Sequence, residues 1–446
     1  MTIADKLKQI KQSTDAIKAS ATALTGEVQT DLTSIAIMLD TANPANATDI
    51  LNMLGYTSTN APDLYNAFLY SLNKEGDLYK DDTSVLLPKL TLDENGVYTG
   101  TVGMFQNSTI LTVPKGKYRV LNFSTPNYNY MFSGCSTLLW IPDLELLGND
   151  YSDTYSCDYM FQSCGSLRTV GNLNMKGCTS AYYMFQGCMK LESIASLDTS
   201  NVTNMGSMFN YCTNLKSIPQ FDASNVTSMQ SMFSSCSNLE SVPELNTSKV
   251  KNMSYIFKGC SSLTSVPPLD YSAVDNMNNG FAYCTGLTTV PDLNFESATN
   301  LQNLFDYDGA LVTVGNLNTP KLTSTSSMFS KCTVLEKIAS IDVQSVTDTY
   351  SIFGWYDSNT LKYVVFKNLG QSSATSWSFS NITNWGVNDD NYPDARQSLI
   401  DTLITYSYDR ASAGMSACTI KLSSTTKALL TDDEITQIAT KGYTIA

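Results

Sequence analysis

A phenylalanine recurs every 24 residues through the middle of the chain, and this repeat limits the possible folds more than any other feature. Nine phenylalanines follow one another without an insertion: Phe161, Phe185, Phe209, Phe233, Phe257, Phe281, Phe305, Phe329 and Phe353. Phe132 and Phe105 extend the series toward the N-terminus at spacings of 29 and 27 residues. A fixed period of this length indicates a solenoid, because each coil can bury its apolar edge only against neighbouring coils.

Other positions of the repeat are also regular relative to the phenylalanine. In one coil they are Cys212, Leu215, Ile218 and Val226, which come three, six, nine and seventeen residues after Phe209. This spacing matches neither a strand nor a helix throughout. It predicts a short extended segment such as 215–221, then a turn, then a helical or irregular return such as 229–233. Ten such coils at sheet spacing would span about 45–50 Å.

The residues of one coil carry a family resemblance. The run Asp-Thr-Ser-Asn-Val-Thr-Asn-Met at 198–205, followed by Met208-Phe209, Cys212 and Leu215, resembles the BspA-type leucine-rich repeat. The resemblance covers more than half of the chain, and it implies a leucine-rich-repeat solenoid. Its members occur in bacterial and protist surface proteins and in phage structural proteins, usually as binding surfaces. The segment 218–221 is shorter here than the strand run of the family.

Residues 1–40 are predicted to form an oligomerising coiled-coil helix. Its heptad positions are Ile3, Leu7, Ile10, Ile17, Leu24, Val28 and Ile35. Branched residues at d positions disfavour parallel dimers, so the predicted homo-oligomer is a parallel trimer. A single amphipathic helix packed on its own chain is the alternative. The opening Thr-Ile-Ala-Asp-Lys-Leu also resembles the N-termini of some phage-encoded structural proteins that bear such repeats.

Three further regions complete the predicted α+β organisation. Residues 41–85 are a small helical anchor or collar, and residues 86–357 are the solenoid with its N-terminal cap, where Asn95-Gly96 predicts a hairpin turn. Residues 358–446 are predicted to be a C-terminal α/β cap. Its expected elements are a last solenoid strand at 361–366, helices at 396–407 and 432–441, strands at 419–422 and 443–445, and a polar loop holding Trp377, Phe379 and Trp385.

Charge and hydropathy exclude two classes of partner. The formal net charge of −14, with only 27 basic residues, would repel phosphate backbones, so nucleic acid is not an expected partner. No apolar run reaches the length needed to span a bilayer, so membrane insertion is not expected either. The first residues lack the apolar core of a signal peptide, which favours assembly in the cytoplasm.

Eight of the eleven cysteines occupy the position three residues after the phenylalanine. Successive coils are parallel, so neighbouring column cysteines point the same way and are poorly placed for disulfide bonds. We interpret the column as a ladder of buried free thiols that pack like small apolar residues, as expected in a reducing compartment. Disulfide or metal-bound cysteines are the alternative.

Catalysis is not expected from this sequence. It contains no histidine, which removes serine–histidine and cysteine–histidine mechanisms and imidazole metal ligands. It also lacks a Walker loop, a dinucleotide fingerprint and a nucleophile elbow, so no cofactor is expected. An Asp or Asn recurs thirteen residues after each phenylalanine from Phe161 to Phe329, as at Asp198 and Asp222. This column predicts a ladder of backbone-binding turns, with a calcium ladder as the alternative.

Variable polar residues on a regular scaffold are where a repeat protein would encode specificity. The positions seven and eight residues after the phenylalanine vary most, and they belong to the exposed side of the strand segment. The predicted ligand-binding face comprises Trp140, Arg168, Lys216, Gln220 and Glu244.

The resemblance and the composition together predict a non-enzymatic virion protein. It would be a phage head or tail fibre or decoration protein, assembled in the host cytoplasm and anchored to other virion proteins by its N-terminus. Its solenoid would bind a host-surface glycan or protein. The alternative is a bacterial cell-surface or secreted leucine-rich-repeat adhesin.

Overall fold

The computed structural model describes residues 91–446 apart from 93, 109–112, 114–115, 121–126, 149–153, 349–351, 354–359, 375 and 380–381. The predicted oligomerising helix at 1–40, with all its heptad residues, lies outside the described residues. The predicted anchor at 41–85 lies outside them as well, so both stay predictions.

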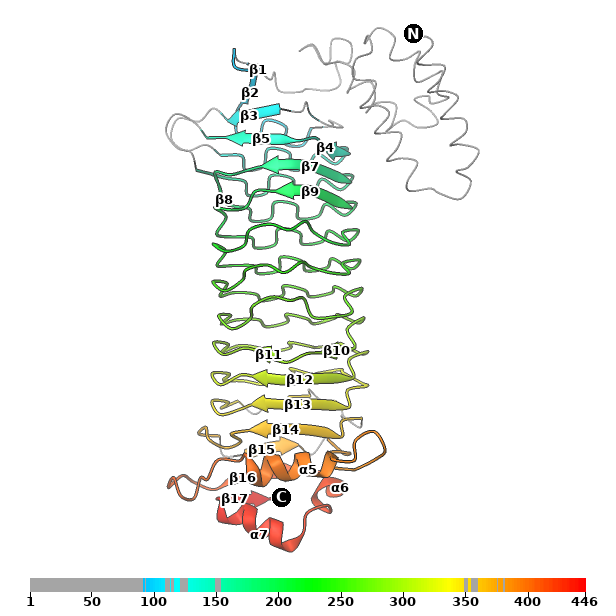
Figure 1. The fold of residues 1–446 in the computed structure, drawn as a ribbon, viewed down its shortest axis with the longest axis vertical. Coiled ribbons are helices and arrows are strands. Elements are labelled where there is room, and N and C mark those ends of the chain that lie inside the picture. The colour runs from blue at the N-terminus through cyan, green and yellow to red at the C-terminus, as the bar shows by residue number, and fades with distance from the viewer. Residues whose placement is uncertain are drawn as a thin grey trace, which may run out of the picture.

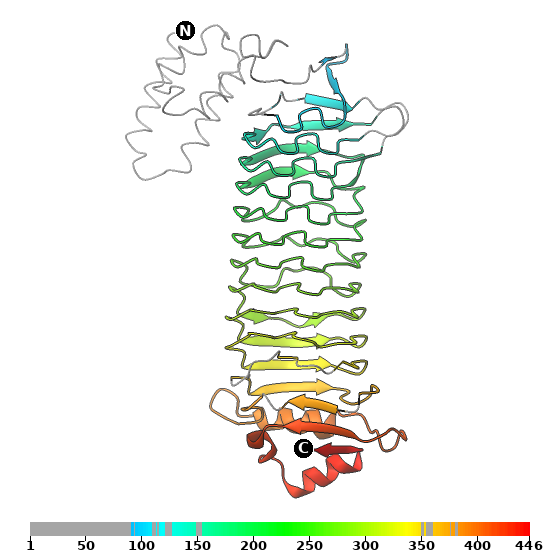
Figure 2. The ribbon, with the colours of Figure 1, turned by 180° about the vertical axis from the view of Figure 1, so that it is seen from behind.

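The repeats stack as the coils of one elongated β-solenoid (Figures 1 and 2). Strands of successive coils pair in parallel one repeat apart, as Thr289 pairs with Thr313 and Thr313 with Lys337. The first sheet contains β1 (Thr91–Leu92), β2 (Val97–Gly100), β3 (Gly116–Val120), β4 (Trp140–Ile141), β5 (Leu144–Leu147), β7 (Thr169–Asn174) and β9 (Ser193–Leu197). The second contains β10 (Thr289–Val290), β11 (Leu293–Asn294), β12 (Thr313–Asn318), β13 (Lys337–Asp342) and β14 (Tyr363–Lys367).

The predicted hairpin at the start of the solenoid is confirmed. Strands β1 and β2 pair antiparallel, with Leu92 opposite Tyr98. Between them Gly96 has a φ of +71°, the left-handed conformation that the turn requires and that glycine adopts without steric cost. Strand β2 then pairs in parallel with β3, which begins the regular stacking.

The phenylalanine column is the centre of the core. Successive rings are stacked, with centroids 5.0 Å apart for Phe132 and Phe161 and 5.7 Å apart for Phe209 and Phe233. The rings from Phe105 to Phe353 are all buried. Side chains six, nine and twelve residues after each phenylalanine close the core from the strand side, as Leu215, Ile218 and Phe221 do in one coil; all three are buried.

Proline decides where regular strands form. The residue ten positions after the phenylalanine is Gly or Ala in the coils of β7, β9, β12 and β13, and each of these strands is continuous. Pro142 separates β4 from β5, and Pro291 separates β10 from β11. The coils with Pro219, Pro243 and Pro267 contain no regular strand at this place. Proline has no N–H to give to the adjacent coil, so it interrupts the ladder.

The return segment of each coil is built from turns rather than a helix. Residues 230–235 form consecutive turns, so the irregular alternative is correct. A second ladder runs along this side: β6 (Tyr155–Ser156) pairs with β8 (Cys178–Ser180), and single bridges continue it, as between Ser180 and Asn204. Two residues per coil adopt a left-handed conformation, one two residues before and one two residues after the phenylalanine. This conformation costs a residue with a side chain roughly 1–2 kcal/mol.

The C-terminal region adds a three-stranded sheet and helices below the last coil (Figure 1). Strands β15 (Ser376–Phe379), β16 (Cys418–Leu422) and β17 (Tyr443–Ile445) pair in that order. The helices are α5 (Ala395–Ile400), which continues as the π-helical turn η3 (Asp401–Thr405), α6 (Ser424–Lys427) and α7 (Asp432–Thr440).

The aromatic residues expected in a polar loop are buried instead. Trp377 and Phe379 lie on β15, and both are buried. Trp385 is fully buried, and its indole N–H donates to the Val364 carbonyl of β14 at 3.1 Å. Sequence reasoning was wrong here because it took the surrounding serines and asparagines as a loop. Strand pairing with β16 buries the alternate aromatic residues.

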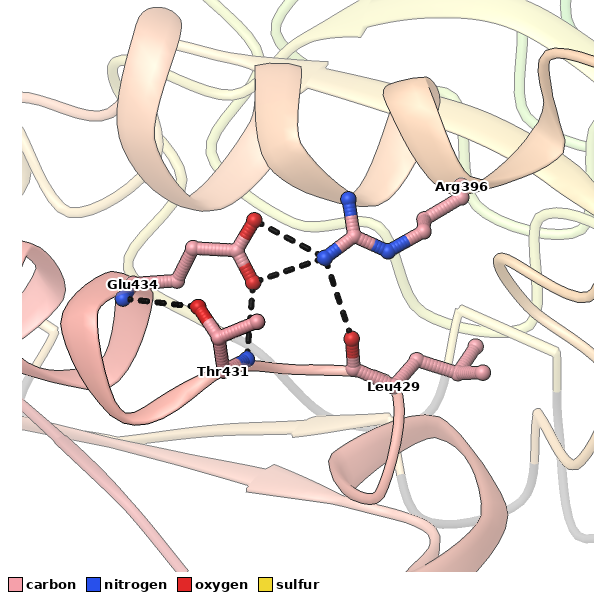
Figure 3. Close-up of polar contacts among 4 residues, drawn as sticks. All are labelled: Arg396, Leu429, Thr431 and Glu434. Atoms are coloured by element: carbon pink, nitrogen blue, oxygen red, sulfur yellow. Dashed lines mark hydrogen bonds and ion pairs between the residues drawn. The ribbon is translucent and has the colours of Figure 1, made fainter.

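A carboxylate–guanidinium contact ties α5 to α7 (Figure 3). One Arg396 guanidinium nitrogen donates to both Glu434 carboxylate oxygens, at 2.8 and 2.9 Å, and to the Leu429 carbonyl at 3.2 Å. Glu434 also accepts from the backbone N–H of Thr431, whose hydroxyl accepts from the Glu434 N–H. This capping box starts α7. The Glu434 carboxylate therefore holds the N-terminus of α7 and, through Arg396, the neighbouring helix α5.

The cysteines are buried free thiols, as the packed-thiol interpretation predicts. The column thiols also contact the backbone of the preceding coil: Cys188 Sγ donates to the Phe161 carbonyl at 3.1 Å, and Cys212 Sγ donates to the Phe185 carbonyl at 3.1 Å. Burial raises the pKa of Cys236 to about 12, so this thiol stays protonated and unreactive at neutral pH.

One coil carries a carboxyl group in the cysteine column. Asp308 is fully buried, and its Oδ1 accepts from the Cys284 backbone N–H at 2.7 Å. Its Oδ2 is buried without a hydrogen-bond partner among the described residues. Desolvation, and then the nearby Asp306 carboxylate, raise the pKa of Asp308 from 3.8 to about 8. The group is therefore protonated at neutral pH.

We expect Phe233→Ala to lower the free energy of unfolding by about 3–5 kcal/mol, because it leaves a cavity in a stacked column. Chemical denaturation of the full chain measures this. Ser241→Ala, exposed on the same coil, is the control and should change the value by less than about 0.5 kcal/mol. A neutral Phe233→Ala would contradict the core assignment.

We expect Asp308→Cys, which restores the residue of the other coils, to remove a pH dependence of stability. The folded state raises the pKa of Asp308, so protonation of this carboxyl group stabilises the folded protein. This stabilisation is fully present below about pH 4 and is lost as the pH rises through about 8. The stability advantage of Asp308→Cys over the wild type should therefore grow between these values in denaturation curves. Parallel curves for the two proteins would show that Asp308 is not a buried acid.

Candidate ligand-binding faces

The strand face is defined here as the outward side chains seven to thirteen residues after each column phenylalanine. All five residues predicted to bind ligand lie on it. Trp140 and Arg168 are partly exposed, and Lys216, Gln220 and Glu244 are exposed. They are distributed over four coils, because Trp140 precedes the coil of Arg168 and Lys216 comes two coils further on. The structure therefore places them on one face but does not gather them into one site.

Opposite charges on the strand face pair between successive coils. Arg168 Nη1 lies 3.0 Å from Glu192 Oε1, and Lys216 Nζ lies 3.8 Å from Glu240 Oε1. Each pair joins residues 24 positions apart, so the pairing follows from the stacking. Exposed pairs of this kind add little stability. Their main effect is to give this face an alternating pattern of charge.

A groove on the strand face contains two of the predicted residues. Gln220 Nε2 donates to the Glu244 carbonyl at 2.7 Å and bridges two coils. The groove has a volume of about 740 Å³, and it continues to Pro268 and Asp270 on the next coil. Its complete lining is Gln220, Glu244, Leu245, Asn246, Thr247, Pro268, Leu269 and Asp270.

The groove lies where proline interrupts the sheet. Pro219, Pro243 and Pro267 occupy the same position of three successive coils, and Pro268 follows directly. Strand pairing here is reduced to a single bridge between Leu245 and Leu269. The Glu244 and Asp270 side chains line the groove, and their carboxylates favour a ligand that donates hydrogen bonds.

The Asp and Asn column forms turns, as predicted. Asp222 Oδ1 accepts from the Ser224 backbone N–H at 2.8 Å, and Asn246 and Asp270 accept in the same way from residues 248 and 272. The hydrogen bonds from Ser224 hold the pKa of Asp222 below its usual value. Each side chain thus ends its own strand segment.

The described residues contain no group of three or more His, Cys, Asp or Glu side chains that could hold a metal ion. None of the described helices has the length and apolar character needed to cross a membrane.

A second exposed surface was missed by sequence reasoning. We call it the return face: in each coil it runs from five residues before the column phenylalanine to two residues after it. The buried Val226, Met229 and Met232 point from this side into the core that Leu215 and Ile218 close from the other side, so the two faces are opposite. Its left-handed positions carry tyrosines: Tyr130, Tyr159, Tyr183, Tyr211, Tyr255, Tyr283 and Tyr307. Their spacing relative to the phenylalanines could have identified them.

Comparison with known proteins finds a family model that is similar to the regular coils. Residues 155–268 and 264–363 match a family model described as "Mycoplasma protein of unknown function, DUF285". No curated protein matches the sequence. Among solved structures, "Crystal structure of T. pallidum Leucine Rich Repeat protein (TpLRR)" is 18% identical, with a TM-score of 0.25, over 57% of this chain and 91% of that chain.

We expect the triple variant Lys216→Ala, Gln220→Ala and Glu244→Ala to remain folded. Its free energy of unfolding should fall by about 1–2 kcal/mol at most, because these exposed side chains make one weak ion pair and one hydrogen bond between successive coils. Denaturant titration measures the change. Leu245→Ala, buried in the same groove wall, should cost about 2–5 kcal/mol. A larger loss from the surface triple variant would make the strand face structural.

Proposed function

We propose that this chain is a non-enzymatic phage fibre or decoration protein that presents its solenoid for binding to a host surface. The N-terminus would attach it to other virion proteins, and the strand face would contact a host glycan or protein. The resemblance of its coils to BspA-type leucine-rich repeats motivates this proposal.

One observation carries the binding role. The core positions are nearly uniform from coil to coil, whereas the strand-face positions change in charge, size and polarity, as Arg168, Lys216 and Thr264 do at one position. A uniform core holds these side chains at fixed separations on a rigid surface. Such a surface needs no catalytic group, and its polar atoms are suited to recognition.

We propose a different role for each end of the solenoid. The heptads at 1–40 would gather three chains, so that weak single contacts combine and exceed single-site affinity by roughly 10²–10⁴. At the other end we propose that the C-terminal α/β region closes the column. Its support is that the Thr402 hydroxyl accepts from the Phe366 backbone N–H at 3.0 Å, and the Trp385 indole bonds the same last strand.

Assembly in the host cytoplasm fits the chemistry of the chain. Buried free thiols are typical of proteins folded under reducing conditions. The net charge of −14 disfavours contact with the packaged genome. A bacterial cell-surface or secreted adhesin is the alternative, because the same solenoid would serve it. The two proposals differ in where the chain is found. A virion protein is detected in purified phage particles, and an adhesin is detected in the washed cell envelope or the medium.

We expect the full chain to be a trimer and a chain that starts near Thr83 to be a monomer, since the heptads at 1–40 carry the association. Native mass measurement of both proteins tests this. Replacement of Ile10 and Ile17 by Asp should separate the full-length trimer while leaving the solenoid folded. Full-length chains that stay monomeric in purified particles as well as in solution would contradict the proposal.

We expect particles that lack residues 104–446 to assemble but to adsorb poorly to host cells. The triple variant Lys216→Ala, Gln220→Ala and Glu244→Ala should reduce adsorption at least tenfold if the strand face makes the contact. A matched control with Lys421→Ala, Asp433→Ala and Gln437→Ala, all exposed in the C-terminal region, should adsorb normally. Normal adsorption by the truncated particles would leave the solenoid with an architectural role.

A further inference from the structure

The tyrosines of the return face are not needed to build the coil. They hold φ values between 57° and 64°, a conformation that a bulky side chain adopts rarely. The coil of Phe233 has Ser231 and Ser235 at these two positions, and its ring still stacks on those of both neighbouring coils, with centroids 5.7 and 5.6 Å apart. Because smaller residues satisfy the backbone, the tyrosines point to a role outside folding.

These tyrosines form rows along the column. The rings of Tyr130, Tyr159 and Tyr183 are stacked, with successive centroids 4.8 and 5.2 Å apart. Tyr283 and Tyr307 form a second stack at 4.7 Å. Stacking holds each ring at a fixed angle to the surface, so little conformational freedom would be lost when a ligand binds.

The exposed apolar surface on this face belongs largely to the same residues. Tyr211 is 52% exposed, Tyr307 is 44% exposed, and Tyr283 is 40% exposed. A tyrosine combines an apolar ring with a hydroxyl group, so it can pack against C–H surface and form a hydrogen bond at the same time. Lysines flank the second stack: Lys258 Nζ lies 5.6 Å from the Tyr283 ring centre, and Lys331 Nζ lies 5.8 Å from that of Tyr307.

The return face is electrically neutral up to residue 331, although the chain as a whole is strongly acidic; Asp348 adds one negative charge in the last coil. From residue 156 to residue 331 its charged members are Asp158, Lys258, Asp306 and Lys331, so their charges cancel. The remaining outward residues are mainly Ser, Asn, Gln and Tyr. A surface of this kind neither attracts nor strongly repels ions, and it offers amide and hydroxyl groups that both donate and accept hydrogen bonds.

We infer that the return face is a second ligand surface and that its ligand is an uncharged polysaccharide. Hydroxyl-rich rings with C–H faces match tyrosine rings set among amides and hydroxyls, and a polymer without charge matches the neutral face. This inference rests on the proposed binding function, and it assigns a ligand class to the face that the strand-face prediction did not include.

Periodicity favours a polysaccharide over a folded protein. The return face repeats its polar positions once per coil, as the parallel bridges from Ser180 to Asn204 and from Asn204 to Ser228 show. A polymer with a repeating unit can make a similar contact at each coil, so weak contacts add along the column. A globular protein without internal repeats has no matching series of contacts on its surface.

Affinity electrophoresis of the full chain in gels containing amylose, mannan, galactan, dextran or soluble cellulose derivatives without charge tests the inference. We expect retardation by at least one of these neutral polysaccharides and none by polygalacturonate. The triple variant Tyr211→Ser, Tyr283→Ser and Tyr307→Ser should weaken binding at least tenfold. Serine already occupies the equivalent position at Ser235, so the coil should remain folded, which a thermal unfolding curve checks.

Two controls separate this inference from the proposed function. Tyr406→Ser, a 45% exposed tyrosine of the C-terminal region, should bind like the wild type. So should the strand-face triple variant at 216, 220 and 244. Failure of all the neutral polysaccharides to bind, or normal binding by the tyrosine triple variant, would overturn the inference. Periodate oxidises the glycans of the host cells. If the tyrosine variants still adsorb less than the wild type to such treated cells, the partner is a protein, and this result also overturns the inference. None of these three results would affect the strand-face adsorption test.

Discussion

Each coil depends on its neighbour for the hydrogen bonds and apolar contacts of its most buried residue. The Phe161 backbone N–H donates to the Met184 carbonyl of the following coil at 2.8 Å. Its carbonyl accepts from the Cys188 thiol of that coil at 3.1 Å, and its ring stacks 5.0 Å from that of Phe185. One isolated coil could satisfy none of these groups. Stability therefore accumulates from coil to coil, and the column requires a closed end at each terminus.

This arrangement leaves the two outer faces free to differ. The strand face carries paired charges, and three successive prolines open a groove in it, because proline cannot continue the ladder of backbone hydrogen bonds. The return face is neutral up to residue 331 and rich in tyrosine. These tyrosines have a left-handed backbone conformation at positions where other coils carry smaller residues. The core tolerates both kinds of surface because the ion pairs and ring contacts between their exposed side chains lie outside the buried column. The two faces can therefore differ in charge and polarity above one common core.

Departures from the repeat have local physical causes. Asp308 replaces a column cysteine and remains buried, because its proton removes the charge and its Oδ1 accepts from the Cys284 backbone. Trp385 lies in a polar segment of the sequence, yet a hydrogen bond to Val364 places it under the last strand of the solenoid. In both places the surrounding structure determines the environment of the residue, and the residue type alone would predict a different one.

The sequence by itself determined the solenoid, its period, the buried phenylalanine and cysteine columns and the turns at the aspartate positions, because these follow from spacing between near neighbours and from a repeat that must bury one edge. It also placed Gln220 and Glu244 on one exposed face. Only the tertiary structure decided that these two residues share a groove, that the tyrosines form a neutral row on the opposite face, and that Trp377 and Phe379 are buried. Those features depend on which coils touch and on the backbone direction at left-handed turns. Both are set by contacts between residues 24 or more positions apart, which a local pattern does not contain.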